Sequence, residues 1–333
     1  MEEMKMIRTI LVPLDGSDVA EQGLATACRI AAESGATLLL VRAVLYFGVE
    51  EGVRSEEAHD LLEAREYLGR VQRDLERHGL MAVTEVLPVE PVRAILFAAE
   101  SYPVDLISIC THGHSGIQHA LLGSVAEAVL RRSTTPILLT RAGEHAAPQT
   151  VAPYGRILVP LDGTAFAETA LSYVGGHGIG REASLLLLRV VPDASLPLMP
   201  GATGYGAPEA LELAARETQE QRLEGESYLG ALGAARLADG TWQTRVVVGE
   251  AGEAILDVAG REGADLIALA THGRHGWDRL LHGSVTGHLL HRSTIPMLIL
   301  RGVAAEIAEE GVDAAAVRAV PAALSAGHID PSV

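Results

Sequence analysis

The chain has few aromatic side chains and few positive charges. Aromatic residues make up 4% of its 333 residues and hydrophobic residues 48%, so the core must be built mainly from aliphatic side chains, as in α/β proteins. The formal net charge is −17, and no run of Lys and Arg offsets it, so a phosphate backbone or an anionic membrane would be repelled. We therefore expect neither nucleic acid nor a membrane as a partner.

A secretory signal and a membrane-spanning segment are also missing. The first 30 residues hold no charged segment that is followed by an apolar segment and a cleavage site. The longest apolar run, Ala183 to Leu188, stops at Arg189 and is far shorter than the roughly 20 residues that a spanning helix needs. Cys28 and Cys110 are the only cysteines. We expect a soluble protein of the reducing cytoplasm.

What the sequence does contain is an internal repeat. The segment Ile10–Gly16 returns as Ile157–Gly163 at an offset of 147 residues. Farther along, Thr111–Gly113 returns as Thr271–Gly273 at an offset of 160 residues. The difference of 13 residues indicates an insertion in the second half.

The length and the repeat together predict two domains, since one domain usually holds roughly 100–200 residues. We assign a first domain to residues 1–143, a linker to 144–155 and a second domain to 156–302. The tail 303–333 is rich in Ala and has no partner in the first half, and we expect a short helix there that frays. The insertion, at 192–208, is rich in Pro and Gly and is either a lid over a ligand or a surface loop.

Each half alternates short apolar strands with helical stretches. In the first half we expect strands at 10–14, 37–44, 82–87, 106–110 and 136–140, and helices at 20–34, 57–78, 91–101 and 124–132. Nearly continuous apolar runs are typical of parallel strands that are covered on both faces. The predicted fold class is therefore α/β, with two tandem doubly wound domains that each contain a five-stranded parallel sheet.

Candidate binding residues follow the strands, because ligands of open parallel sheets bind beyond the carboxyl ends of the strands. They are the acids Asp15 and Asp162 after the first strand, the glycines Gly113 and Gly273 after the fourth strand, and the pairs Gly123–Ser124 and Gly283–Ser284 at the start of the next helix. A glycine lets backbone N–H groups approach phosphate oxygens closely, and a helix start adds its positive dipole end. The pattern predicts a pocket for the phosphate tail of a nucleotide.

The two acids, Cys110 and the histidines of the second half each have more than one interpretation. The carboxylates of Asp15 and Asp162 can accept hydrogen bonds from a ribose or an adenine, or they can cap the following helix. Their recurrence beside both Gly-Ser pairs favours contact with a ligand. Cys110 is either a buried small residue or a redox-sensitive thiol beside the pocket. The histidines between His272 and His291 lack a carboxylate or cysteine at a recognisable spacing, so no metal site is predicted.

The motifs resemble those of universal stress proteins. The chain has Val-Pro-Leu-Asp-Gly-Ser near its start, Thr-His-Gly followed after nine residues by Gly-Ser-Val, and Ser-Thr-x-Pro before a last strand. The resemblance covers residues 7–142 and 156–302. In that family the ATP signature is Gly, two residues, Gly, nine residues, Gly, then Ser or Thr. Here Cys110 and Ala270 stand at the first glycine of the signature.

The second half is more similar to the family pattern than the first. It has Gly249 and Ala251 after the third strand, where the first half has Val89 and Pro91, and it adds Arg274, whose guanidinium could meet phosphates. If only one half binds a nucleotide, we expect it to be the second.

The resemblance implies specific contacts with ATP. The adenine would rest against Ala43 or Val190, and the ribose would meet Asp15 or Asp162. The phosphates would meet Gly113, Gly123 and Ser124 in the first half, with Val125 beside them, and Gly273, Arg274, Gly283 and Ser284 in the second half, with Val285 beside them. Mg²⁺ is the ion expected to accompany the ATP.

The resemblance also implies an architecture and a function. The fold would be similar to that of adenine nucleotide α-hydrolases, and the last strands, 136–140 and 296–300, would pair across a pseudo-twofold axis. The protein would be an ATP-binding stress-response regulator or energy sensor with slow ATP hydrolysis at most, not an enzyme. A homodimer and an unidentified protein partner are expected. The alternative is a family member that binds no nucleotide and serves as a structural or interaction module. A nucleotide transferase would require a phosphate-loop motif that the chain lacks.

Overall fold

The computed structural model describes residues 6–45, 54–111, 122–142, 152–194, 207–237, 241–271 and 284–302. Most of the predicted linker, most of the predicted insertion and the whole predicted tail lie outside these residues.

In the described residues of the first half, nine elements alternate between strand and helix. They are β1 (Thr9–Pro13), α1 (Asp18–Ser34), β2 (Thr37–Ala43), α2 (Arg54–Arg77), β3 (Ala82–Leu87), α3 (Pro91–Ser101), β4 (Leu106–Thr111), α4 (Ser124–Arg132) and β5 (Ile137–Arg141). Every strand and helix predicted in this half is present, with ends shifted by three residues or fewer, because the apolar periodicity determines their existence more firmly than their ends.

The second half repeats this order. Its elements are β6 (Arg156–Pro160), α5 (Ala165–His177), β7 (Ser184–Val191), α6 (Ala207–Arg236), β8 (Trp242–Val248), α7 (Ala251–Arg261), β9 (Leu266–Thr271), α9 (Val285–Arg292) and β10 (Met297–Arg301). The longest helices, α2 with 24 residues and α6 with 30, are strongly charged. None of the helices in the described residues is both long and apolar enough to cross a membrane.

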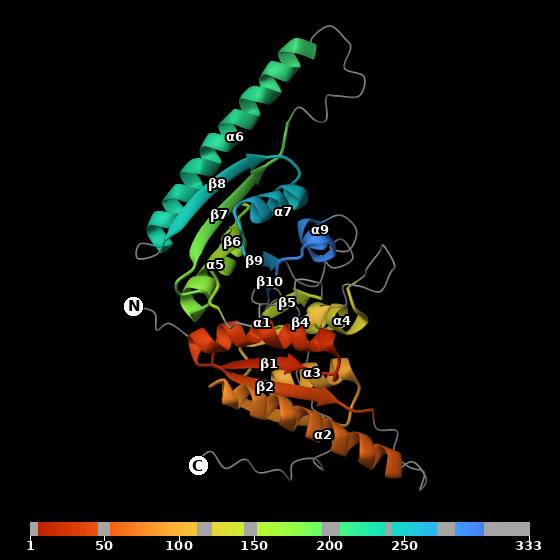
Figure 1. The fold of residues 1–333 in the computed structure, drawn as a ribbon. Coiled ribbons are helices and arrows are strands. Elements are labelled where there is room, and N and C mark those ends of the chain that lie inside the picture. The colour runs from red at the N-terminus through yellow and green to blue at the C-terminus, as the bar shows by residue number, and fades with distance from the viewer. Residues whose placement is uncertain are drawn as a thin grey trace, which may run out of the picture.

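The ten strands of the described part of the chain form one sheet, in the order β3-β2-β1-β4-β5-β10-β9-β6-β7-β8. Strands are parallel within each half, and the halves join where β5 and β10 run antiparallel, with Leu138 opposite Leu298. The order is a palindrome about this junction, so the two halves are related by a pseudo-twofold axis, as predicted. Figure 1 shows the halves side by side with the long helices α2 and α6 at the two ends.

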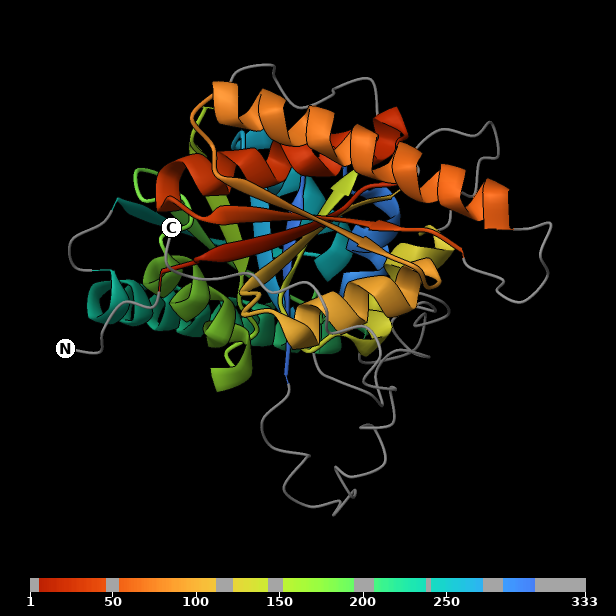
Figure 2. The ribbon, with the colours of Figure 1, turned by 90° about the horizontal axis from the view of Figure 1, so that it is seen from below.

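The sheet is covered by helices on both faces. One buried cluster contains side chains of α1, α2, α5 and α6, and the other contains side chains of α3, α4, α7 and α9. In Figure 2 the first-half strands lie between α1 and α2 on one side and α3 on the other. Successive strand residues therefore serve different faces, as when Ile10 and Val12 join the first cluster and Leu11 the second. This explains the continuous apolar strands.

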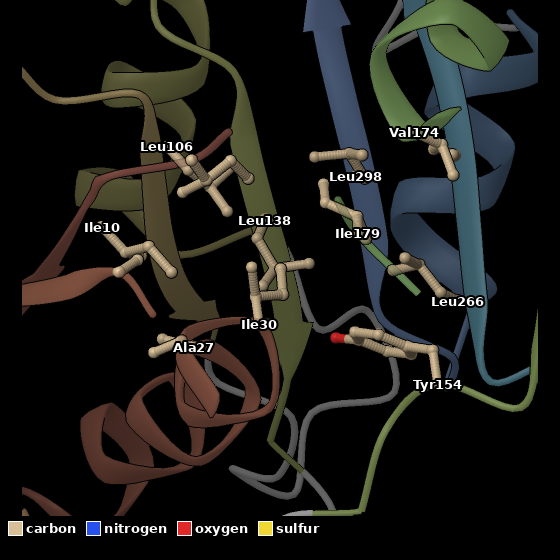
Figure 3. Close-up of a cluster of buried hydrophobic side chains, with 14 of the residues drawn as sticks. Ile10, Ala27, Ile30, Leu106, Leu138, Tyr154, Val174, Ile179, Leu266 and Leu298 are labelled. Atoms are coloured by element: carbon tan, nitrogen blue, oxygen red, sulfur yellow. The ribbon is translucent and has the colours of Figure 1, made fainter. Parts of the chain in front are cut away.

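The core continues across the junction between the halves. Tyr154 precedes β6 and is 1% exposed. Figure 3 shows its ring among side chains of both halves, with Ile30 and Leu138 from the first and Ile179 and Leu266 from the second. The two halves thus share one hydrophobic core and form a single packed unit.

Candidate functional sites in the two halves

Each half has a cavity at the carboxyl ends of its parallel strands. The first has a volume of about 250 Å³ and the second of about 340 Å³. Each is bounded by the ends of the first, second and fourth strands of its half and by the starts of the helices α3 and α4, or α7 and α9. This is the location where doubly wound sheets bind ligands.

Most of the sequence-predicted site residues lie around these cavities. The residues that line the first cavity include Asp15, Ala43, Gly123, Ser124 and Val125. Those that line the second include Asp162, Val190, Ser284 and Val285. The other four predicted residues lie outside the described residues, namely Gly113, Gly273, Arg274 and Gly283. The structure therefore brings together, in each half, residues from three distant parts of the chain.

The acid after the first strand organises the loop that follows it. Oδ1 of Asp15 accepts hydrogen bonds from the backbone N of Ser17 at 2.9 Å and from its Oγ at 2.6 Å. The Ser17 hydroxyl in turn caps the first turn of α1. In the second half Asp162 makes the same two bonds to Thr164, at 2.9 and 2.6 Å, and Thr164 caps α5. The interpretation of the acids as helix caps is therefore wrong, because the following hydroxyl residue is the cap and the acid orients it.

A glycine between the acid and the cap allows the loop to close over an arginine. Gly16 and Gly163 have φ values of 90° and 88°, in the left-handed region that favours glycine. A Cβ on Gly16 would lie 3.5 Å from a guanidinium nitrogen of Arg42, and one on Gly163 would lie 2.5 Å from the equivalent atom of Arg189. Arg42, the penultimate residue of β2, and Arg189, at the equivalent place in β7, thus lie against the loop that follows the first strand of their half.

The arginine under the loop is held by a tyrosine that sequence reasoning missed. The guanidinium of Arg42 lies 5.1 Å from the ring centre of Tyr67 on α2, and the Tyr67 hydroxyl donates to Glu21 at 2.9 Å. Burial, together with Glu21, raises the pKa of Tyr67 well above its usual range, so the hydroxyl stays a donor. The second half repeats the cluster with Arg189, Tyr228 and Glu168. The available signal was the arginine that interrupts an apolar strand at the same place in both halves.

Cys110, which stands at the first glycine of the ATP signature, is accommodated by a glycine on the helix behind the strand. A Cβ added to Gly23 of α1 would lie 3.0 Å from the backbone N of Cys110 and 3.3 Å from its Cβ. In the second half Ala170 stands in the place of Gly23, and Ala270 packs against the same hydrophobic cluster that contains Ala170. The helix α1 thus packs closely on the backbone of β4 at Gly23, where the second half has an alanine.

The thiols of both cysteines are protonated near neutral pH. Burial raises the pKa of Cys110 to about 11, although backbone hydrogen bonds with Thr111 and Gly23 partly offset this effect. Burial also raises the pKa of Cys28 to about 12, with a contribution from Asp74. Because the thiolate is the reactive form, these values favour the interpretation of Cys110 as a packed small residue over that of a redox-sensitive thiol.

The helices that border the cavities begin differently in the two halves. Gly123 is the N-cap of α4 and supplies no side-chain cap, whereas Ser284 caps α9 by accepting from the backbone N of Gly287 at 3.1 Å. Both α3 and α7 are capped by a glutamate, Glu90 and Glu250, that sequence reasoning also missed. The next residue, Pro91 or Ala251, lines the cavity.

The charge of Glu250 is stabilised in the folded protein. Backbone N–H groups of Glu253 and Gly252 lower the pKa of its carboxyl, and His288 adds to this effect. The side chain of His288 packs against Gly252, where an added Cβ would lie 2.6 Å from the imidazole. Within the described ranges no group of three or more His, Cys, Asp or Glu side chains is placed to hold a metal ion.

Comparisons with known proteins cover both halves. A model of the universal stress protein family matches residues 6–141 and 153–301. A universal stress protein of Methanocaldococcus jannaschii is 33% identical over 141 residues, which are 41% of this chain and 83% of that protein. One of Mycolicibacterium smegmatis is 24% identical over 304 residues, 88% of this chain and 96% of that protein. The crystal structure of one from Archaeoglobus fulgidus matches with a TM-score of 0.65 and 20% identity over 88% of this chain and 98% of that chain, which shows a shared fold.

Proposed function

Because the chain belongs to the universal stress protein family, we propose that it binds ATP in its cavities and acts as a stress-response regulator or energy sensor. One observation carries the proposal. In each half one cavity brings together a carboxylate, an apolar wall and the start of a helix. These groups suit the ribose, the base and the phosphate tail of a nucleotide, respectively. The two cavities contain these three groups at equivalent places, although several of the residues that line them differ between the halves.

The chemistry of each cavity suggests how ATP would lie. The adenine would pack on the apolar wall at the end of the second strand, where Ala43 or Val190 lies. The ribose hydroxyls would donate to Asp15 or Asp162, whose carboxylates are already fixed by the capping residue. The phosphates would extend toward the start of α4 or α9, where Ser124 or Ser284 stands and unpaired N–H groups favour negative charge. Gly113, Gly273, Arg274 and Gly283 would complete the phosphate contacts.

The second cavity is the better candidate for ATP. It is larger, at about 340 Å³ against about 250 Å³. Small-molecule sites typically have volumes of about 300 to 1,000 Å³. Ala251 lines it where the rigid ring of Pro91 lines the first, and Arg274 follows Gly273 in the sequence. We propose that Mg²⁺ accompanies the ATP.

The location and the partners follow from the same proposal. Two unpaired cysteines, Cys28 and Cys110, fit a reducing cytoplasm. A regulator that reports the nucleotide level needs a protein that reads its state, and a homodimer would provide such a surface. ATP hydrolysis would be slow, because the described cavity walls bring no general base to the phosphate end.

Calorimetric titration of the full chain with ATP and Mg²⁺ tests the proposal. We expect measurable binding and a loss of the tighter event in a Val190→Trp variant, because an indole would fill the second cavity. Ala43→Trp is the matched change in the first half, and Val248→Trp, at an exposed position on β8, is the control that should leave both events unchanged.

Two outcomes would contradict the proposal. Absence of heat with the wild-type chain at millimolar ATP would favour the family member that binds no nucleotide. Turnover of ATP above about one per minute would instead indicate an enzyme.

A further inference from the structure

Two arginines cross between the halves and hold each other's helices. Arg141 is the last residue of β5, and its Nη1 donates to the backbone carbonyl of His291 near the end of α9. Arg301 is the last residue of β10, and its Nη1 donates to the carbonyl of Arg131 at 2.6 Å and to that of Ser133 at 2.9 Å. The two contacts are equivalent at the offset of 160 residues. Each half therefore supplies an arginine to a helix of the other.

The carbonyls that the arginines reach are at the C-terminal ends of α4 and α9. The last carbonyls of a helix have no partner within the helix and carry the negative end of its dipole, so a guanidinium stabilises them both as a donor and as a charge. These two helices have only 9 and 8 residues, a length of about 12 to 14 Å at the usual rise per residue. Ser124 and Ser284 at their other ends line the cavities. An anchor at one end thus positions the binding end of the same helix.

The arginines are also tied to the cavity of their own half. Arg141 is paired in register with Thr111 of β4, and the next residue, Ala142, donates its N–H to the Thr111 carbonyl at 2.9 Å. Thr111 directly follows Cys110, which lines the first cavity. In the second half Arg301 is paired with Thr271, which lines the second cavity itself.

These contacts form two crossed connections between the cavities. One runs from Thr111 through Arg141 to α9 and Ser284, and the other runs from Thr271 through Arg301 to α4. Both consist of a strand end, a charge-assisted hydrogen bond and a short helix, which are stiff elements. A displacement of either strand end on binding would be passed to the helix that forms the opposite site.

We propose that Arg141 and Arg301 couple the two nucleotide sites, so that occupation of one site changes the affinity of the other. The inference rests on the proposed function, since it concerns the regulation of the same cavities. By thermodynamic linkage the effect must be equal in both directions. The protein would then respond to ATP over a different concentration range from that of two independent sites.

Hydrogen exchange of the nucleotide-free chain tests the crossed anchoring. In an Arg141→Met variant we expect amide exchange to rise about threefold in the last turn of α9, which belongs to the other half, and to stay unchanged in α4. A threefold rise is the modest effect expected when a partly exposed, charge-assisted hydrogen bond is lost. Arg301→Met should affect α4 and leave α9 unchanged. Arg131→Met is the matched control. It also removes a charge from the end of α4, but the ion pair of the Arg131 side chain is with Glu127 of the same helix. Arg141→Lys should restore part of the protection.

The coupling is tested with one cavity closed. In a Val190→Trp chain ATP can enter only the first cavity, and we expect it to change exchange in α9 by about threefold when Arg141 is present and not in the Arg141→Met background. Ala43→Trp with Arg301→Met is the mirror experiment. ATP binding that leaves α9 unchanged in the presence of Arg141 would overturn the coupling alone. A chain that binds no ATP would overturn the proposed function and the coupling with it, and the titration distinguishes the two results.

Discussion

The residues that shape the loop beside each cavity are the same in both halves, whereas the residues behind the fourth strand differ. Around the loop after the first strand, the acid, the glycine and the capping hydroxyl are equivalent in both halves, and so are the arginine, tyrosine and glutamate beneath it. Behind the fourth strand the halves diverge, since Gly23 with Cys110 in the first corresponds to Ala170 with Ala270 in the second. Groups that fix the geometry of the loop are thus duplicated, whereas the small residues where the helix packs on the fourth strand differ.

The junction between the halves breaks the symmetry more strongly. Asp105 and Asp265 stand in equivalent places and each accepts two backbone N–H groups from the start of the first strand of its half. Asp265 also pairs with Arg29 at 2.7 Å, and the Arg29 guanidinium stacks on Tyr154 at 3.9 Å. The residue equivalent to Arg29 is Gly176. The pseudo-twofold therefore provides no second arginine equivalent to Arg29.

The largest effect that tests this asymmetry is expected for Asp265→Ala. We predict a loss of about 3 kcal/mol in the free energy of unfolding, because the change removes two backbone hydrogen bonds and leaves Arg29, 12% exposed, without its carboxylate. The matched Asp105→Ala removes the two equivalent backbone hydrogen bonds of the first half. Urea unfolding followed by circular dichroism gives both values. A loss in Asp265→Ala of no more than the roughly 1.5 kcal/mol expected for two hydrogen bonds would show that the Arg29 pair contributes nothing to stability.

The strands, most helices and the general position of the two cavities could be predicted from the sequence. Continuous apolar strands and the repeat of Asp15 as Asp162 are local signals, and the position of a ligand at the carboxyl ends of parallel strands follows from the topology. The antiparallel contact between β5 and β10 was also predicted correctly, although from the family resemblance and not from the residues.

The long-range contacts around the two cavities could not be predicted, because their partners are far apart in the chain. Arg42 contacts Tyr67 on α2, and no local pattern reveals how this helix is rotated about its axis. Arg141 donates to the carbonyl of His291, which is 150 residues away in the chain. The choice of Ser17 over Asp15 as the cap depends on side-chain rotamers, since both are good capping residues. Burial of Tyr154 in the shared core was hidden by its place in the predicted linker, between Pro153 and Gly155.

The close packing behind the fourth strand predicts an intermediate effect. Gly23→Ala should lower the free energy of unfolding by about 2 kcal/mol, because the new methyl group would lie 3.0 Å from the backbone N of Cys110, which cannot move without moving β4. The matched change in the second half is Ala170→Gly, which should cost about 1 kcal/mol through the flexibility of glycine in a helix.

Thermal unfolding of both variants measures this difference. A Gly23→Ala protein as stable as the wild type would show that α1 and β4 can separate freely, so that volume at position 110 is not constrained by the helix. In that case the departure of Cys110 from the ATP signature could not be explained by packing against Gly23.

The smallest effect concerns the caps of the helices that border the cavities. Glu250→Gln should destabilise the protein by about 0.5 kcal/mol at pH 7, as is usual for an exposed charge at a helix start. The folded-state pKa of Glu250 is lowered, so its contribution is present above the unfolded pKa near 4.5 and is lost as the pH falls through the lower folded value. The difference in unfolding temperature between wild type and variant should therefore shrink as the pH falls below the unfolded pKa and disappear below the folded one. Glu90→Gln is the matched change at a cap where alanine stands in the place of His288, so any excess loss in Glu250→Gln measures the imidazole. A loss that stays constant from pH 7 to pH 3 would show that the glutamate acts through its shape and not through its charge.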